Sequence, residues 1–207
     1  EIDLQLSADQ TPMVFHDYGL NRLTAETGTV AQMKAAQLGA FQLSGGNEGI
    51  PDLAEILDLV AGQAPLLIEF KDQDGAMGTN VGSLEKTAAD LLSKYSGPVA
   101  VMSFNPNSVA CLAEFLPGVA RGIVTSAYTP DDWPLSRVAC DHLRGIPHYD
   151  RAGASFISHE LADLGRARVA ELKANGANVL CWTVKSAVQE AEARKVAENI
   201  TFEQYLA

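Results

Sequence analysis

The sequence is poor in cysteine and in positive charge. Its three cysteines are scattered over 207 residues and show no C-x-x-C spacing, so neither a disulfide framework nor a zinc motif is predicted. Lys and Arg number 15 against 26 Asp and Glu, which gives a formal net charge of −11. This balance argues against nucleic acid and anionic membranes as partners. It does not exclude a small anionic substrate, because a bound metal ion and a few Lys or Arg side chains at the site make the local charge positive.

Long apolar runs and glycine-rich loops are also missing. Without a run of about 18 apolar residues, we expect no stable membrane insertion. No Gly-rich loop follows the first predicted strand, which disfavours nucleotide binding. The chain begins at Glu1 without Met or a recognisable signal peptide. A cytoplasmic location is expected, with a periplasmic or secreted one left open. Nothing in the sequence indicates an oligomeric state.

The chain alternates apolar strands with amphipathic helices. Main strands are predicted over 1–6, 66–71, 99–104, 121–125, 154–158, 178–184 and 199–202, and a short return strand over 12–15. Helices are predicted around 29–39 and over 51–60, 83–95, 106–116, 135–143, 166–175 and 186–196. Such repeated units indicate a parallel sheet with helices outside. An open doubly wound sheet and a closed eight-stranded barrel both fit.

Polar side chains gather where the predicted strands end. Glu1 and Asp3 are two apart and share one strand face, and His16 follows the return strand. Glu69 and Lys71 repeat this spacing on the next strand, where buried charge is costly without a purpose. From these residue types alone, a divalent-metal site with an acid/base partner and a merely solvated polar face both remain open. Convergence at strand ends favours a TIM (β/α)8 barrel.

A closed barrel needs one more strand than the sequence supplies. The simplest interpretation is a single TIM-barrel domain over residues 1–207 whose first β-α unit is absent from this sequence. A polypeptide that truly begins at Glu1 is then expected to have two exposed sheet edges. We expect such a polypeptide to fold poorly and to be inactive.

The opening stretch resembles a known enzyme signature. E-I-D-L-Q-L-S-A-D-Q-T-P-M-V-F-H-D, followed by L-N-R-L-T, is similar to the E-L-D-V-x-L-T-x-D-G-x-x-V-x-H-D and L-x-R-T-T pattern of glycerophosphodiester phosphodiesterases. I-P-D-L-A-E-I-L, L-L-I-E-F-K, V-M-S-F-N-P and C-W-T-V resemble later segments of that family in the same order. The resemblance extends over essentially the whole chain. The family's H-R-G and E-N-T segments have no counterpart.

The resemblance implies a phosphoric diester hydrolase with a TIM barrel. Such an enzyme hydrolyses glycerophosphodiesters to glycerol 3-phosphate and an alcohol, with Mg²⁺ or Ca²⁺ as cofactor and a small-molecule glycerophosphodiester as its partner. The implied roles are metal ligation by Glu1, Asp3 and Glu69, catalysis by His16, and substrate binding by Lys71, Phe104 and Trp182. A second catalytic histidine would belong to the absent H-R-G segment.

Two alternative functions keep the same barrel. One is a related phosphodiesterase acting on lysophospholipid or sphingomyelin-type substrates, and the other is a catalytically inactive binding module. The leaving alcohol and the nucleophile, either water or the substrate's 2-hydroxyl, stay open.

Other polar residues receive smaller roles. His142 and His148 are expected on the surface, while His159 follows a strand end and is a weaker candidate for the active face. Arg22 is expected to brace the second loop, and Asp72 to cap a turn.

Overall fold

A computed structural model describes residues 1–206 of the chain. Its strands form one eight-stranded sheet in the order β2-β1-β3-β4-β5-β6-β7-β8. Their bounds are β1 Ile2–Leu6, β2 Pro12–Val14, β3 Leu66–Phe70, β4 Val99–Ser103, β5 Ala120–Thr125, β6 Phe156–Glu160, β7 Asn178–Val184 and β8 Asn199–Phe202. All neighbours pair in parallel except β1 and β2, which form an antiparallel hairpin. The seven predicted main strands and the return strand are confirmed.

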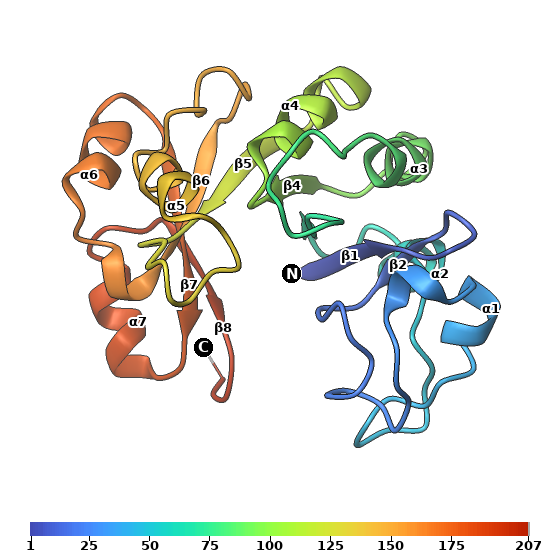
Figure 1. Cartoon of the computed structure of the whole chain (residues 1–207). Helices are drawn as coiled ribbons and strands as arrows, with labels where there is room; N and C mark the ends of the chain where they lie inside the picture. The colour runs from blue at the N-terminus through green and yellow to red at the C-terminus, as the bar shows by residue number, and fades with distance from the viewer. Residues whose placement is uncertain (207) are drawn as a thin grey trace.

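The sheet curls, with helices on its outer side (Figure 1). β2 and β8 stand at the two ends of the strand order, and no pairing joins them within residues 1–206. The result is an α/β fold of the TIM-barrel type with an open seam between β8 and the β1–β2 hairpin. The C-terminal ends of the parallel strands therefore face one common space, as the sequence indicates.

Helices α2, α4, α5 and α7 begin at residues whose side chains cap them. The Asp52 side chain accepts a hydrogen bond from the Glu55 amide ahead of α2, and Asn105 caps α4 just before Pro106. The bounds are α1 Ala35–Leu38, α2 Leu53–Val60, α3 Ser83–Leu92, α4 Pro106–Phe115, α5 Arg137–Arg144, α6 Ala167–Ala174 and α7 Ala187–Ala193. The structure contains no helix within residues 1–206 that has both the length and the apolar character of a membrane span.

The predicted continuous helix around 29–39 is wrong. The structure has a 3₁₀ turn, η1 (Val30–Gln32), and the short α1, separated by extended backbone at Met33. The Ala8 amide donates to the Met33 carbonyl at 2.8 Å, and the Asp9 carboxylate accepts from the Ala35 amide at 2.8 Å. These bonds use groups that a continuous helix would need, so the β1–β2 turn divides the helix.

The apolar core lies mainly between sheet and helices. Leu4, Ile68 and Phe70 are fully buried on the outer face of β1 and β3 and pack against α2 and α3 residues. The alternate residues of the same strands face the concave side. A second apolar cluster there includes Met102, Val124 and Phe156, and forms the floor beneath the strand ends.

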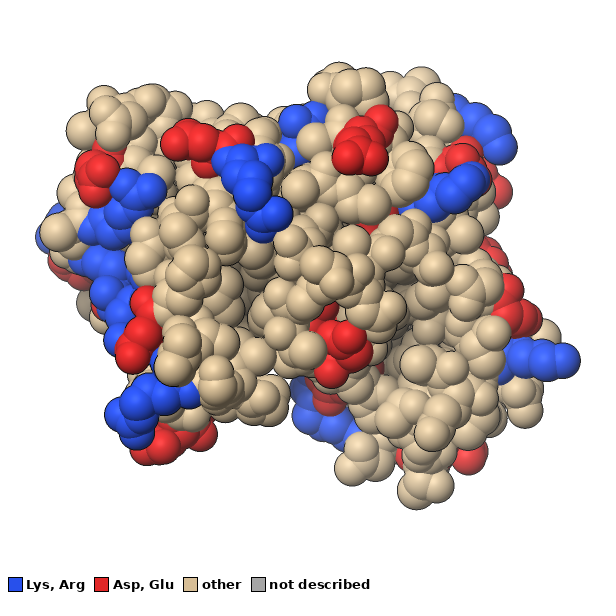
Figure 2. Space-filling model, turned by 45° about the horizontal axis from the view of Figure 1, so that its top comes forward, with Lys and Arg blue, Asp and Glu red and all other residues tan. Residues whose placement is uncertain are grey.

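Basic and acidic side chains are interspersed over the face drawn in Figure 2. Lys and Arg side chains gather along the left edge of this view, with acidic side chains beside them.

Candidate active site

Three carboxylates meet where the start of β1 lies beside the C-terminal end of β3. Parallel pairing places Asp3 directly beside Glu69, and Glu1 precedes Asp3 by two residues on the same face. One oxygen from each of the three side chains lies within 4.8 Å of the others. The structure thus brings together all three residues predicted to bind metal.

Lys71 closes this cluster from the same face of β3. Its Nζ lies 2.7 Å from Asp3 Oδ1 and 2.7 Å from Glu69 Oε1, and the Lys71 and Asp3 side chains are only 12% and 14% exposed. Two carboxylates therefore share one ammonium group in a poorly solvated place, with the more exposed Glu1 beside them.

The pKa values in the cluster reflect this crowding. Burial, with the neighbouring charges of Asp3 and Glu69, raises the pKa of Glu1 to about 7. Burial also raises the pKa of Glu69, against the opposing effect of Lys71. Burial lowers the pKa of Lys71, but Glu69 and Asp3 outweigh this effect and hold it above its usual value. The carboxylates of the site therefore carry more negative charge than Lys71 neutralises, which favours binding of a further cation.

His16 is delivered to the cluster by the hairpin. The Phe15 amide just after β2 donates to the Asp3 carbonyl at 3.0 Å, so the next residue stands at the cavity edge. His16 Nδ1 lies 2.6 Å from Asp17 Oδ1, and Arg22 binds both oxygens of Asp17 at 2.5 and 2.6 Å. Hydrogen bonds from Arg22 and then from His16 lower the pKa of Asp17 to about 2. Arg22 thus braces the loop as predicted.

Gln5 is a supporting residue that the sequence analysis missed. It is 3% exposed and follows Asp3 on the same strand face. Its side-chain Nε2 donates to the carbonyls of Phe15, His16 and Asp17, which fixes the loop that carries the histidine. The two-residue spacing from Asp3 was the available signal, because it places Gln5 on the cavity face.

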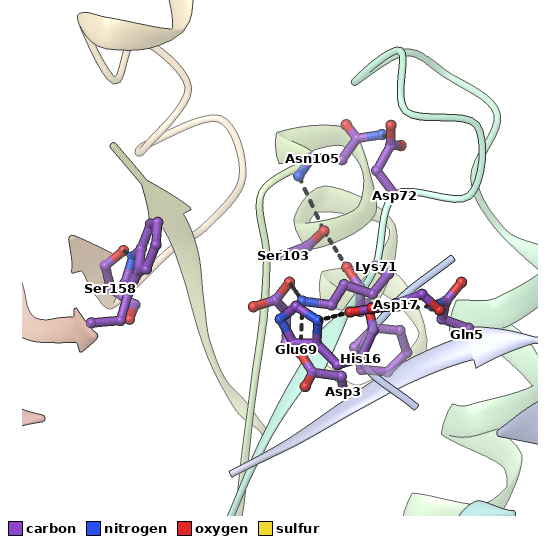
Figure 3. Close-up of polar contacts among 12 residues, drawn as sticks. Asp3, Gln5, His16, Asp17, Glu69, Lys71, Asp72, Ser103, Asn105 and Ser158 are labelled. Carbon is purple, nitrogen blue, oxygen red and sulfur yellow. Dashed lines mark hydrogen bonds and ion pairs between the residues drawn. The ribbon is translucent and has the colours of Figure 1, made fainter. Parts of the chain in front are cut away.

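A cavity of about 260 Å³ borders the carboxylates, Lys71 and His16. Phe104 and Trp182 form part of its wall, with ring centroids 5.5 Å apart, as the sequence predicts for a substrate pocket. Ser158 on β6, which was not predicted, also lines it, and its carbonyl accepts a hydrogen bond from Trp182 Nε1 at 3.0 Å. Figure 3 shows Ser158 across an open space from Asp3, Glu69 and Lys71.

A second hollow of about 350 Å³ shares His16, Glu69, Lys71 and Phe104 with the first. Its additional wall includes the aromatic side chains of Tyr18 and Trp133, which the sequence analysis did not assign to the site. Trp133 stacks at a tilt on Phe104 with a centroid distance of 5.1 Å. The hollow is consequently more aromatic than its neighbour.

A larger hollow, of about 610 Å³, is a weaker candidate despite its size. Apart from Glu1, it is lined by uncharged residues, among them Pro65, Pro98 and Asn199 near the N-terminal ends of strands. Chemistry in such barrels belongs to the opposite ends, where the charged cluster lies.

His159, the weaker candidate for the active face, does not reach the cavity. Its side chain is fully buried on the other face of β6, where Nδ1 lies 2.7 Å from Thr125 Oγ1 and Nε2 lies 3.2 Å from Asp163. Asp72 behaves as predicted and accepts the Met77 amide at 2.8 Å.

The sequence model of the glycerophosphoryl diester phosphodiesterase family matches residues 1–200. The chain belongs to this family. It is therefore a member of a family of hydrolases, and the resemblance carried by the opening stretch is confirmed.

Relatives of known name and structure agree with this membership. YhdW of Bacillus subtilis (strain 168), provisionally named a glycerophosphodiester phosphodiesterase, is 27% identical over 198 residues, 90% of this chain and 74% of the relative. The solved phosphodiesterase of Oleispira antarctica, in complex with the product sn-glycerol-3-phosphate, has a TM-score of 0.77 at 21% identity. It covers 97% of this chain and 79% of its own. The enzyme of Thermotoga maritima has a TM-score of 0.69 at 15% identity, with 97% and 79% covered.

Proposed function

We propose that this family member hydrolyses glycerophosphodiesters to glycerol 3-phosphate and an alcohol, with Mg²⁺ or Ca²⁺ held by Glu1, Asp3 and Glu69. The observation that carries the proposal is the convergence of these carboxylates with Lys71 beside a cavity. The Oleispira antarctica neighbour, solved in complex with its product sn-glycerol-3-phosphate, supports the substrate class.

The donor set fits a hard divalent cation. All three candidate ligands are carboxylates, which suit Mg²⁺ or Ca²⁺ better than zinc. The raised pKa values of Glu1 and Glu69 arise from burial and mutual repulsion, which a cation at this place would relieve. When bound, the ion supplies positive charge against the phosphodiester oxygens without using a proton.

Lys71 provides the second positive charge for the phosphate. An ammonium group has three N–H donors. Two of them are accounted for by Asp3 and Glu69 at 2.7 Å, which leaves one for a phosphate oxygen. Lys71 then has an orienting function towards the substrate as well as a neutralising one towards its acidic neighbours.

His16 is the proposed proton carrier. Asp17 engages its Nδ1, so Nε2 remains as the atom that exchanges a proton with the substrate. Arg22 holds Asp17 in turn, which fixes the ring without contacting the cavity. His16 either activates the nucleophile or protonates the leaving oxygen. Which of these roles it takes depends on whether the nucleophile is water or the substrate's 2-hydroxyl. Oxygen-18 incorporation and trapping of a cyclic phosphate distinguish water from the 2-hydroxyl.

The organic parts of the substrate meet the less charged walls. Phe104 lies between both hollows, and Trp182 and Trp133 flank it on its two sides. Two adjoining spaces that share Lys71 and His16 match a phosphodiester, which carries one organic group on each side of phosphorus.

The decisive experiment is a substrate panel of glycerophosphocholine, glycerophosphoethanolamine and lysophospholipid, each with Mg²⁺, Ca²⁺ or EDTA. From a polypeptide that also carries the predicted first β-α unit, we expect turnover of the first two with metal and its loss in EDTA. Calorimetric binding of glycerol 3-phosphate is measured in parallel, so the site is tested apart from turnover. Glu114→Gln, an exposed carboxylate change on α4, is the matched control for Glu69→Gln.

The same panel decides between the alternatives. Preferred turnover of lysophospholipid would replace the proposed substrate class, and product binding without any turnover would support an inactive binding module. The cytoplasmic location stays a prediction.

A further inference from the structure

Two histidines far from the carboxylate cluster in sequence form a close pair. His142 Nε2 lies 3.0 Å from His148 Nε2, with the ring centroids 5.0 Å apart and the planes inclined by 59°. His142 is exposed and His148 is half-buried. Both were expected to be ordinary surface residues, and their mutual contact was not predicted.

The fold builds this pair through a tight turn. His142 lies in the last turn of α5, and the chain reverses at Ile146, which is 2% exposed and has a positive φ of 47°. Arg168 from α6 holds this reversal, with Nε donating to the Gly145 carbonyl at 3.1 Å and Nη2 to the Ile146 carbonyl at 3.3 Å. His148 is thereby returned over the end of the helix.

The geometry suits a transition metal. Metal–imidazole bonds are about 2.0–2.1 Å long. With 3.0 Å between the two nitrogens, such bonds enclose about 90°, the angle between neighbouring ligands of an octahedron.

We propose that His142 and His148 form a binding site for a divalent transition metal such as Ni²⁺, separate from the carboxylate cluster. Within residues 1–206, the only group of three or more candidate ligands is Glu1, Asp3 and Glu69, so water completes the coordination here. A hollow of about 410 Å³, lined by the pair and by Met77 and Asn107, has room for it. Imidazole selects metals such as Ni²⁺, whereas the carboxylates select Mg²⁺ or Ca²⁺.

Arg151 sets a limit on the affinity of the pair. Its side chain lines the same hollow, and Nη2 donates to Asn107 Oδ1 at 3.1 Å. A guanidinium at this place repels a second cation. Removing its charge with Arg151→Gln is therefore expected to tighten Ni²⁺ binding severalfold, which a simple hydrogen bond between the two rings does not predict.

The test is calorimetric titration of the untagged protein with Ni²⁺ in excess Mg²⁺, which occupies the carboxylate cluster. His142→Ala and His148→Ala should each weaken Ni²⁺ binding at least tenfold and leave phosphodiester turnover unchanged. His16→Ala, which removes a histidine outside the pair, is the matched control and should keep the Ni²⁺ affinity. Unchanged Ni²⁺ binding in both pair variants would overturn the proposal.

A measurement on the unmodified protein guards against variants that fail to fold. Zn²⁺ titration followed by nitrogen-15 NMR of the four histidine rings should shift the Nε2 signals of His142 and His148 first. If only the His16 signals shift, or none do, the metal site is refuted. The contact between His142 and His148 is then a hydrogen bond between neutral rings.

Discussion

The two sides of the cavity differ in charge and in how they are supported. On the β1–β3 side, the wall consists of Glu1, Asp3, Glu69 and Lys71. On the opposite side, β5, β6 and β7 contribute the uncharged Val124, Ser158, Trp182 and Thr183, and Glu203, just after β8, adds one carboxylate to the lining. Figure 3 shows this separation across the open space.

This difference indicates a division of tasks. On the charged side, the Lys71 ion pairs and the Gln5 side chain hold the residues in place. Such support is needed because like charges stand close together there. The neutral side is held by aromatic packing and by the bond from Trp182 to the Ser158 carbonyl. We infer that the charged residues on the β1–β3 side bind and activate the phosphate. The shape of the opposite wall then accommodates the organic groups of the substrate.

The largest effect is expected from Glu69→Gln. Loss of one buried carboxylate should abolish measurable Mg²⁺ binding and lower turnover by about 10³-fold, equivalent to about 4 kcal/mol of barrier. Ser158→Ala, a small change on the neutral side, should alter turnover less than about fivefold. Calorimetry and steady-state kinetics measure both. Equal losses of turnover in the two variants would contradict the proposed division of tasks between the charged and the neutral side.

His16→Ala should follow, with turnover reduced by about 10²–10⁴-fold, the usual contribution of a general acid or base. Mg²⁺ affinity should stay unchanged, because the ring is not among the clustered carboxylates. Combined calorimetry and kinetics separate these quantities. Near-normal turnover would remove His16 from the reaction.

Lys71→Met sharpens the comparison, because it changes charge while keeping much of the volume. We expect kcat/KM to fall by about 10²-fold through loss of a charged contact to phosphate. Mg²⁺ binding should become tighter, since Asp3 and Glu69 no longer pair with the ammonium. Weaker Mg²⁺ binding in this variant would mean that Lys71 organises the carboxylates.

A smaller effect is expected on the neutral side from Trp182→Phe. The variant keeps a ring beside Phe104 but loses the indole N–H bond to the Ser158 carbonyl. KM should rise by about two- to tenfold with kcat preserved, as for one neutral hydrogen bond. A large fall in kcat would assign Trp182 to the reacting centre.

The smallest predicted effect concerns His159, on the outer face of β6 behind Ser158. Burial lowers its pKa, against the opposing effect of Asp163, so the unfolded chain binds a proton more readily than the folded one. Stability from this group is present above the ordinary pKa of about 6.5 and is lost as pH falls from that value through the lower pKa of the folded state, by at most about 1.4 kcal/mol per pH unit. Urea unfolding between pH 8 and 5 should show this slope, reduced in His159→Gln. An identical slope in the variant would contradict the assignment.

Sequence alone predicts the charged side well and the neutral side poorly. Two-residue spacing determines the common face of Glu1 and Asp3, and strand pairing repeats it at Glu69. Trp133 carries no such local pattern, because the long excursion between β5 and α5 brings it to the cavity, and Ser158 lies inside β6 as an uncharged residue that does not mark the cavity face. His142 and His148 depend on a turn at Ile146 that no regular periodicity indicates.

The β1–β2 hairpin also restricts how the length of its connecting turn can change. Asp3 and His16 are delivered by one ladder, in which Leu4 pairs with Val14 and the Phe15 amide bonds the Asp3 carbonyl. Alternation along a strand means that a one-residue insertion kept within β2 would turn Phe15 towards the cavity and His16 away from it. Insertions accommodated wholly in the turn at Ala8–Gln10 would preserve the face. Natural length variation should accordingly concentrate in that turn and spare the three paired residues of β2.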